Sequence, residues 1–183
     1  MDFQPSPEPD AGIEFFVISE KGNIPNSHLP VILYRNTFPQ DSPDLADLIE
    51  GRFRENGWTN AWRDGVYSFH HYHSTTHEVL GVFRGSATLN LGGEGGRFVE
   101  VVSGDVVVIP AGVAHKCLSC SGDFMVVGAY PGGKEPDLLR DDPGDREQAD
   151  RNLPLVPLPP TDPVHGDGGP LNHRWLHAGG QEG

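Results

Sequence analysis

The sequence has little cysteine, few basic residues and no long hydrophobic run. Its 2 cysteines in 183 residues indicate a protein that does not depend on disulfides, which is typical of the reducing cytoplasm. No stretch reaches the roughly 18 consecutive apolar residues of a transmembrane helix. Residues 1–12 are acidic and proline-rich and lack the basic and apolar parts of a signal peptide. We therefore expect a cytoplasmic protein without a membrane-spanning segment.

The scarcity of basic residues narrows the expected partners. Lysine and arginine total 13 against 26 aspartates and glutamates, which gives a formal net charge of −13. A surface with this charge repels phosphate backbones and anionic lipids, so nucleic acid and membrane are excluded as partners. A small-molecule substrate or ligand is the expected partner, and a homodimer is compatible with the sequence.

Short strands dominate the pattern of apolar residues. Apolar segments separated by turn residues predict strands over 13–18, 29–34, 86–91, 98–102, 106–109 and 124–130. Only residues 41–56 predict a convincing helix. Its apolar stripe consists of Leu45, Leu48, Ile49 and Phe53. We expect this helix to pack on the outside of a sheet, with an oligomer contact as the alternative. Many short strands with one helix predict a sandwich or a small barrel.

The residues that can carry chemistry concentrate in 65–85, GVYSFHHYHSTTHEVLGVFRG. The apolar residues before and after the histidines predict two strands around a short turn. Alternate side chains on a strand share a face, so His71 and His73 point the same way, with Cα atoms about 6.5 Å apart. Two imidazoles at this spacing can converge on one metal ion. Glu78 can enter from the neighbouring strand, and His115, after a later apolar strand, is a fourth candidate ligand.

Two neighbouring features leave alternatives open. His77 precedes Glu78 and would replace it if the turn slipped by one residue, whereas His70 has the opposite parity to His71 and is not expected to be a ligand. The second feature is a C-x-x-C motif, formed by Cys117 and Cys120. Buried, inert cysteines are the expected interpretation, with a thiol near the metal as the alternative.

Two stretches resemble the paired signatures of the cupin superfamily. The first signature, G-x5-H-x-H-x4-E-x6-G, is matched by Gly65, His71, His73, Glu78 and Gly85. The second, G-x5-P-x-G-x2-H-x3-N, is matched by Gly104, Pro110, Gly112 and His115, with Ser119 in place of the final Asn. The order of the remaining chain looks like the bacterial single-domain cupins of the YjlB type, a group without a settled activity.

The resemblance implies a fold and a ligand set. The expected fold is all-β, a double-stranded β-helix (the cupin jelly-roll barrel) with one peripheral helix and an irregular C-terminal tail. Residues 1–183 would form a single domain, with the barrel core at about 13–130 and a C-terminal wrapping segment at 131–183. The implied metal ligands are His71, His73, Glu78 and His115.

Three imidazoles and a carboxylate suit a divalent transition metal: Fe, Mn, Ni, Cu or Zn. We expect a metal-dependent enzyme, a dioxygenase-like oxidoreductase that acts on a small organic molecule inside the barrel. A non-catalytic metal-containing binding or sensor protein is one alternative, and a cupin isomerase or epimerase is another, because the fold alone does not choose the reaction. By parity, Tyr67, Phe69 and Cys117 are the expected inward neighbours of the site.

Overall fold

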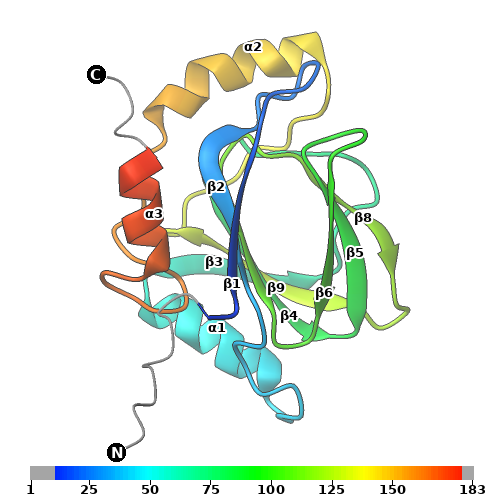
Figure 1. Cartoon of the computed structure of the whole chain (residues 1–183), viewed down its shortest axis with the longest axis vertical. Helices are drawn as coiled ribbons and strands as arrows, with labels where there is room; N and C mark the ends of the chain where they lie inside the picture. The colour runs from blue at the N-terminus through cyan, green and yellow to red at the C-terminus, as the bar shows by residue number, and fades with distance from the viewer. Residues whose placement is uncertain (1–10, 179–183) are drawn as a thin grey trace, which may run out of the picture.

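Two antiparallel β-sheets face each other in the part of the chain that the computed structural model describes, residues 11–178 (Figure 1). The larger sheet has the order β1-β2-β7-β4-β9-β3. Its strands are β1 (Ile13–Ile18), β2 (Ser27–Tyr34), β3 (Trp58–Asp64), β4 (Glu78–Arg84), β7 (Val106–Ile109) and β9 (Met125–Pro131). The smaller sheet has the order β6-β5-β8. Its strands are β5 (Ser86–Leu91), β6 (Arg97–Val102) and β8 (His115–Cys120). The arrangement is the expected jelly-roll barrel.

The central strands of the larger sheet are buried on both faces. In β2, Val31 and Leu33 belong to the core between the two sheets, whereas Ile32 and Tyr34 belong to a second core beneath the helices. Strand β7 repeats this alternation. A strand that is covered on both sides needs apolar residues at every position, which explains the continuous runs in these two strands.

Helix α1 (Leu45–Glu55) packs on the outside of the larger sheet, as expected. Its buried residues include Ile49 and Phe53, while Leu48 from the predicted stripe stays 46% exposed. Close packing depends on Gly81 in β4, because a Cβ there would lie 2.4 Å from Cγ2 of Ile49. The absence of a side chain at Gly81 therefore lets helix α1 pack closely against the outer face of the larger sheet.

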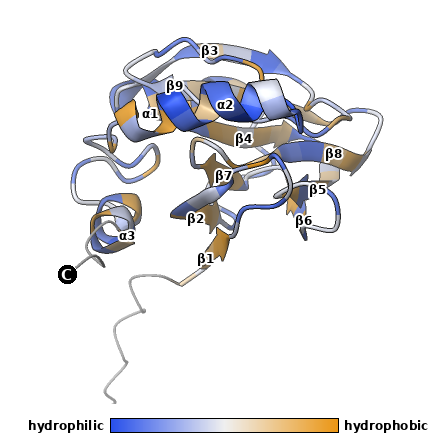
Figure 2. Ribbon diagram, turned by 90° about the horizontal axis from the view of Figure 1, so that it is seen from above, coloured by the Kyte–Doolittle hydropathy of each residue, from blue (hydrophilic) through white to orange (hydrophobic). Residues whose placement is uncertain are grey.

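The described part of the C-terminal segment, residues 131–178, packs against the barrel, and the prediction that it is irregular is wrong. It contains helix α2 (Pro143–Asn152), a 3-10 turn (Leu153–Leu155) and helix α3 (Pro170–Ala178). Helix α2 begins where the carboxylate of Asp142 accepts hydrogen bonds from the first backbone N–H groups. It buries only Ala149 and is mostly hydrophilic (Figure 2). The helix therefore has no apolar period, and its sequence signals are confined to its ends, where Asp142 caps the first turn and Pro143 opens it.

Helix α3 is held to the barrel by one large side chain. Trp175 is fully buried, and its indole N–H donates to the carbonyl of Pro30 at 3.0 Å. Leu171 joins it in the core beneath the helices. The tail thus completes the outer core of the larger sheet.

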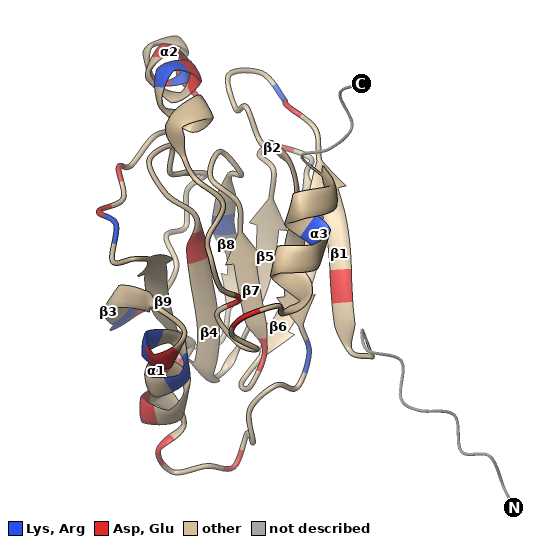
Figure 3. Cartoon of the chain, turned by 90° about the vertical axis from the view of Figure 1, so that its left-hand side faces the viewer, with Lys and Arg blue, Asp and Glu red and all other residues tan. Residues whose placement is uncertain are grey.

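Charged side chains lie mostly on the helices and loops, while the strands carry few of them (Figure 3). Arg146 of α2, for example, pairs with Asp150 of the same helix and with Glu20 before β2, at 2.7 and 2.8 Å. None of the helices in residues 11–178 combines the length and the hydrophobicity needed to cross a bilayer.

Candidate metal centre

The segment that carries His71 and His73 is extended, but it is not the strand that the sequence predicted. Between β3 and β4 the chain makes only isolated bridges, His71 to His115 and Tyr72 to Leu139. The backbone N–H groups of His71 and His115 donate to each other's carbonyl at 3.2 and 2.9 Å. This pairing brings the two imidazole centroids to 4.1 Å. The segment with His71 and His73 is therefore held by bridges to distant parts of the chain rather than by membership of a regular strand.

The structure brings all four predicted ligands together. Possible ligand atoms of His71, His73 and His115 lie within 4.8 Å of one another, and all three side chains are buried. Glu78, the first residue of β4, places one carboxylate oxygen 3.1 Å from Nε2 of His115 and the other 3.3 Å from Nε2 of His73. That these four side chains bind a metal stays a prediction.

Each of the three imidazoles is oriented by a backbone carbonyl. Nδ1 of His71 lies 3.1 Å from the carbonyl of Phe69, and Nδ1 of His115 lies 3.1 Å from that of Val113. Nδ1 of His73 lies 2.5 Å from the carbonyl of Asp137. Since a carbonyl can only accept, Nδ1 carries a proton in each ring, and Nε2 is the nitrogen left to bind a metal once it is unprotonated. Metal-binding histidines in proteins are oriented in the same way.

The charges in the cluster favour a bound cation, because a neutral imidazole and an ionised carboxylate lie close together. Burial lowers the pKa of His71 to about 3, so its imidazole is neutral. Burial alone would raise the pKa of Glu78, but the charge of His73 and hydrogen bonds from both neighbouring imidazoles outweigh it and hold the carboxylate ionised. The same attraction overcomes burial at His73 and raises its pKa. A hydrogen bond from Nε2 to the carboxylate of Glu78 needs a proton on that nitrogen. A divalent cation bound between the imidazoles and the carboxylate would take the place of that proton. This donor set fits a divalent transition metal.

His77 does not compete with Glu78. Its Nδ1 accepts from the backbone N–H of Ala111 at 2.9 Å, and its Nε2 donates to the carbonyl of Pro157 at 3.1 Å. Its ring packs against Trp175 at 4.7 Å, and burial lowers its pKa to about 4. His77 therefore anchors the C-terminal segment, and the one-residue slip does not occur. His70, as expected, points elsewhere, with Nε2 3.6 Å from the carboxylate of Glu94.

Sequence reasoning missed Asp137. Besides offering its carbonyl to His73, it accepts hydrogen bonds through its carboxylate from the N–H and the hydroxyl of Ser74, at 2.6 and 2.5 Å. The N–H of Thr75 adds a longer bond of 3.3 Å. These contacts join residues more than 60 positions apart, and no local pattern announces them. The C-terminal segment is thus part of the support of the cluster.

A cavity of about 520 Å³ opens beside the cluster, with all four predicted ligands in its lining. Of the three residues expected to point inward, only Tyr67 lines it. Phe69 instead stacks on Tyr67, with ring centroids 4.7 Å apart. Cys117 is buried in the core between the sheets.

The hydroxyl of Tyr130 is a second polar group of the cavity that the sequence did not reveal. It accepts from the indole N–H of Trp62 at 2.8 Å, and the charge of Glu78 acts on it. Burial, and then the charge of Glu78, raise its pKa, so the phenol stays protonated. Gly128 makes this placement possible, because a Cβ there would lie 2.2 Å from the indole of Trp62.

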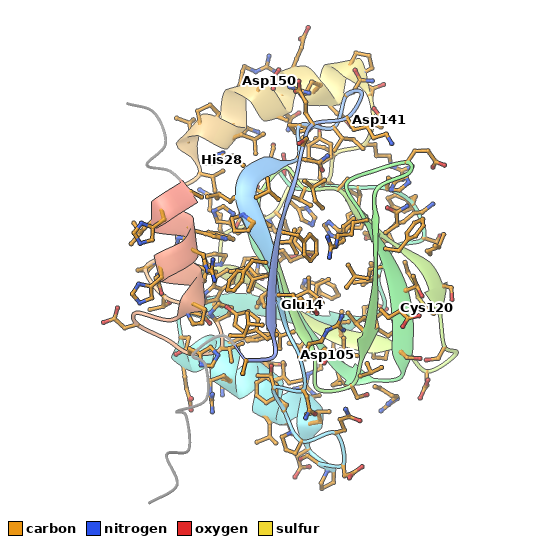
Figure 4. The ribbon with its side chains drawn as sticks, viewed as in Figure 1. Glu14, His28, Asp105, Cys120, Asp141 and Asp150 are labelled. Carbon is orange, nitrogen blue, oxygen red and sulfur yellow. A yellow bond between two sulfur atoms is a disulfide. The ribbon has the colours of Figure 1, made fainter. Side chains whose placement is uncertain are left out.

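The interpretation of the two cysteines as inert thiols, and the alternative of a thiol near the metal, are both wrong. Cys117 and Cys120 are joined in a disulfide, with Cα atoms 6.4 Å apart. Cys120 lies at the end of β8 (Figure 4). The reason for the disulfide is a β-bulge: Leu89 pairs with Cys117 and Thr88 with Ser119, so the residue between them is extra. A bulge shifts the alternation of the strand, and side chains three positions apart can then meet.

No protein-family model matches the sequence. The uncharacterised protein YjlB of Bacillus subtilis (strain 168) is 43% identical over 162 residues, which cover 88% of this chain and 95% of YjlB. Acireductone dioxygenase from Bacillus anthracis, with a cadmium ion in its active centre, aligns at 16% identity with a TM-score of 0.39, over 58% of this chain and 82% of the enzyme. The 3,4-ketoisomerase QdtA from Thermoanaerobacterium thermosaccharolyticum aligns at 15% identity with a TM-score of 0.41, over 51% of this chain and 74% of QdtA.

Proposed function

The chain belongs to the family of YjlB, and from this premise we propose that it is a metal-dependent enzyme that acts on a small organic molecule inside the barrel. The observation that carries the proposal is the buried cluster of three histidines and Glu78 beside an open cavity. A cluster that served only to stabilise the fold would have no need of a cavity at its side, whereas catalytic metal sites keep an open position. A dioxygenase-type oxidoreductase is the proposed reaction class.

The four side chains would hold Fe, Mn, Ni, Cu or Zn. When bound, such an ion supplies Lewis-acid chemistry, and a redox-active one also supports oxidation by dioxygen. The protein's own residues keep the imidazoles oriented through Nδ1 and keep Glu78 ionised. Tyr130, with its raised pKa, holds its proton beside the cluster.

A ligand-binding or sensor protein is the second candidate, because the same cavity would serve it. An isomerase or epimerase fits less well. Such reactions need an acid and a base that are free to exchange protons with the substrate. In this cavity Glu78 faces two imidazoles and the hydroxyl of Tyr130, and that hydroxyl is itself held by Trp62.

The test begins with elemental analysis of untagged protein. Protein loaded with Fe(II) under argon is then mixed with diketone and catechol substrates, and oxygen consumption is followed after air is admitted. A His71→Ala/His115→Ala double variant should lose the metal and the activity. His28→Ala, which changes an exposed histidine, should keep both. Full metal content in the double variant would refute the site.

A further measurement separates the two candidates. Mass spectrometry of the small molecule that copurifies, before and after aerobic incubation with metal, shows whether it is changed. A molecule recovered unchanged at stoichiometric amounts would favour binding over catalysis. The small-molecule partner, a homodimeric assembly and a single domain over residues 1–183 stay predictions.

A further inference from the structure

The cavity beside the histidine cluster holds one basic residue, Arg63, among the described residues that line it. Arg63 is already engaged by helix α1. One guanidinium nitrogen lies 2.7 Å from the carboxylate of Asp47, and Nε lies 2.8 Å from that of Glu50. With two carboxylates beside it, the single positive charge of this guanidinium is already balanced, so a further anion there would gain little. The lining therefore offers no ready site for a phosphate or for a distal carboxylate.

Apart from the hydroxyls of Tyr67 and Tyr130, the other polar groups of the wall away from the histidine cluster are also engaged within the protein. The carboxylate of Asp64 accepts from the N–H of Gly65 at 2.7 Å, and Asp137 is occupied by the turn at Ser74. The indole N–H of Trp62 is taken by Tyr130. Asp64 and Asp137 are acidic. The part of the wall that lies away from the histidine cluster therefore repels anionic groups of a ligand.

What the wall offers instead is apolar surface. Its apolar members are Trp62, Val66, Tyr67, Leu80, Pro136 and Leu138. Two of them at the rim are exposed, Tyr67 at 55% and Leu138 at 47%. Burying such surface against a ligand is favourable in proportion to its area.

Resting on the proposed metal site, we propose that the substrate is a small amphipathic molecule with one oxygen-chelating head and an uncharged apolar body. The head would reach the metal held by the histidines, and the body would lie against the apolar wall. Phosphorylated compounds and compounds with a distal negative charge are disfavoured, because the one lining guanidinium already faces the carboxylates of Asp47 and Glu50.

Three hydroxamates that share one chelating head test this inference. Acetohydroxamate has almost no body, benzohydroxamate has an apolar one, and para-carboxybenzohydroxamate carries a distal negative charge. Each is titrated calorimetrically into the Zn(II)-loaded full-length chain and into the metal-free chain. Benzohydroxamate should bind about 10- to 30-fold more tightly than acetohydroxamate, from the area of its ring. The carboxylated probe should bind at least about 10-fold more weakly than benzohydroxamate, because its charge would be buried unpaired.

Two leucines with nearly equal exposure provide matched variants. Leu138→Ser changes the wall at a residue that is 47% exposed, and Leu118→Ser changes one that is 49% exposed and lies outside the lining. Leu138→Ser should weaken benzohydroxamate about 3- to 5-fold while leaving acetohydroxamate unchanged. Leu118→Ser should change neither.

The results distinguish failure of the proposed substrate class from failure of the proposed metal site. If the carboxylated probe binds as tightly as benzohydroxamate, or if acetohydroxamate equals it, the substrate class is refuted and the metal site stands. If no probe prefers the zinc-loaded chain, the metal site is refuted and the inference fails with it.

Discussion

Replacing Asp137 by alanine should damage both the fold and the metal site, although Asp137 is not one of the four predicted ligands. Its carboxylate accepts two short hydrogen bonds from Ser74, and its carbonyl orients His73. A hydrogen bond to an ionised group contributes about 1.5–3 kcal/mol. Because Asp137 is only half-buried, water recovers part of the loss, and we expect about 3 kcal/mol less free energy of unfolding for the metal-free protein.

The effect on the metal follows from the carbonyl. Without its carboxylate, residue 137 is no longer held against the turn at Ser74, and its carbonyl no longer keeps the imidazole of His73 in one orientation. Losing such an orienting group typically costs about 10- to 100-fold in metal affinity. Urea unfolding of the metal-free protein measures the first loss, and competition with a chelator for Zn(II) measures the second.

Two further variants test whether the carboxylate of Asp137 causes these losses. Asp137→Asn keeps one oxygen to accept from the N–H of Ser74 and should show a smaller loss in both assays. Asp150→Ala removes an exposed carboxylate that pairs with Arg146 on α2, and should cost less than about 1 kcal/mol. Unchanged zinc affinity in Asp137→Ala would refute the idea that the C-terminal segment supports the cluster.

Three further outcomes are expected. Tyr130→Phe removes a hydroxyl that lines the cavity and whose pKa the charge of Glu78 raises; it should weaken metal binding about 10-fold and shift the absorption bands of the Co(II)-substituted protein, and an unaltered spectrum would speak against an influence of this hydroxyl on Glu78. His77→Leu leaves a buried backbone N–H and a carbonyl without their partner and should lower the free energy of unfolding by about 2–4 kcal/mol, with metal content unchanged; loss of the metal would instead make His77 a ligand. The rise in Tm that Zn(II) produces should become smaller as the pH falls from about 8 to about 5.5. The reason is that the raised pKa of His73 lets a proton compete with the metal for Nε2. That same proton stabilises the metal-free fold below the unfolded pKa of His73, and the gain disappears as the pH rises through its folded pKa; a gain in Tm that is constant over this range would contradict the histidine site.

Features that depend on neighbours along the chain were predictable. The continuous apolar runs of β2 and β7 and the stripe of α1 report burial directly, since each follows the period of its own element. The spacing of His71, His73 and Glu78 marked the cluster for the same reason. Even there the local structure differed, because the first two residues lie on an extended segment that is held by bridges to distant partners rather than on a strand.

Tertiary structure alone decided the rest. Asp137 supports His73 across a separation of 64 positions, and His77 turns away from the cluster because Pro157, 80 residues later, accepts from it. Helix α2 buries a single residue, so it has no apolar period to detect. The disulfide between Cys117 and Cys120 depends on a bulge that only pairing with β5 creates. The sequence by itself determined which side chains could bind a metal and which strands would be buried, because both are local properties. Contacts between distant segments decided which groups orient those side chains and which residues line the cavity. Such contacts produce no periodic pattern in the sequence.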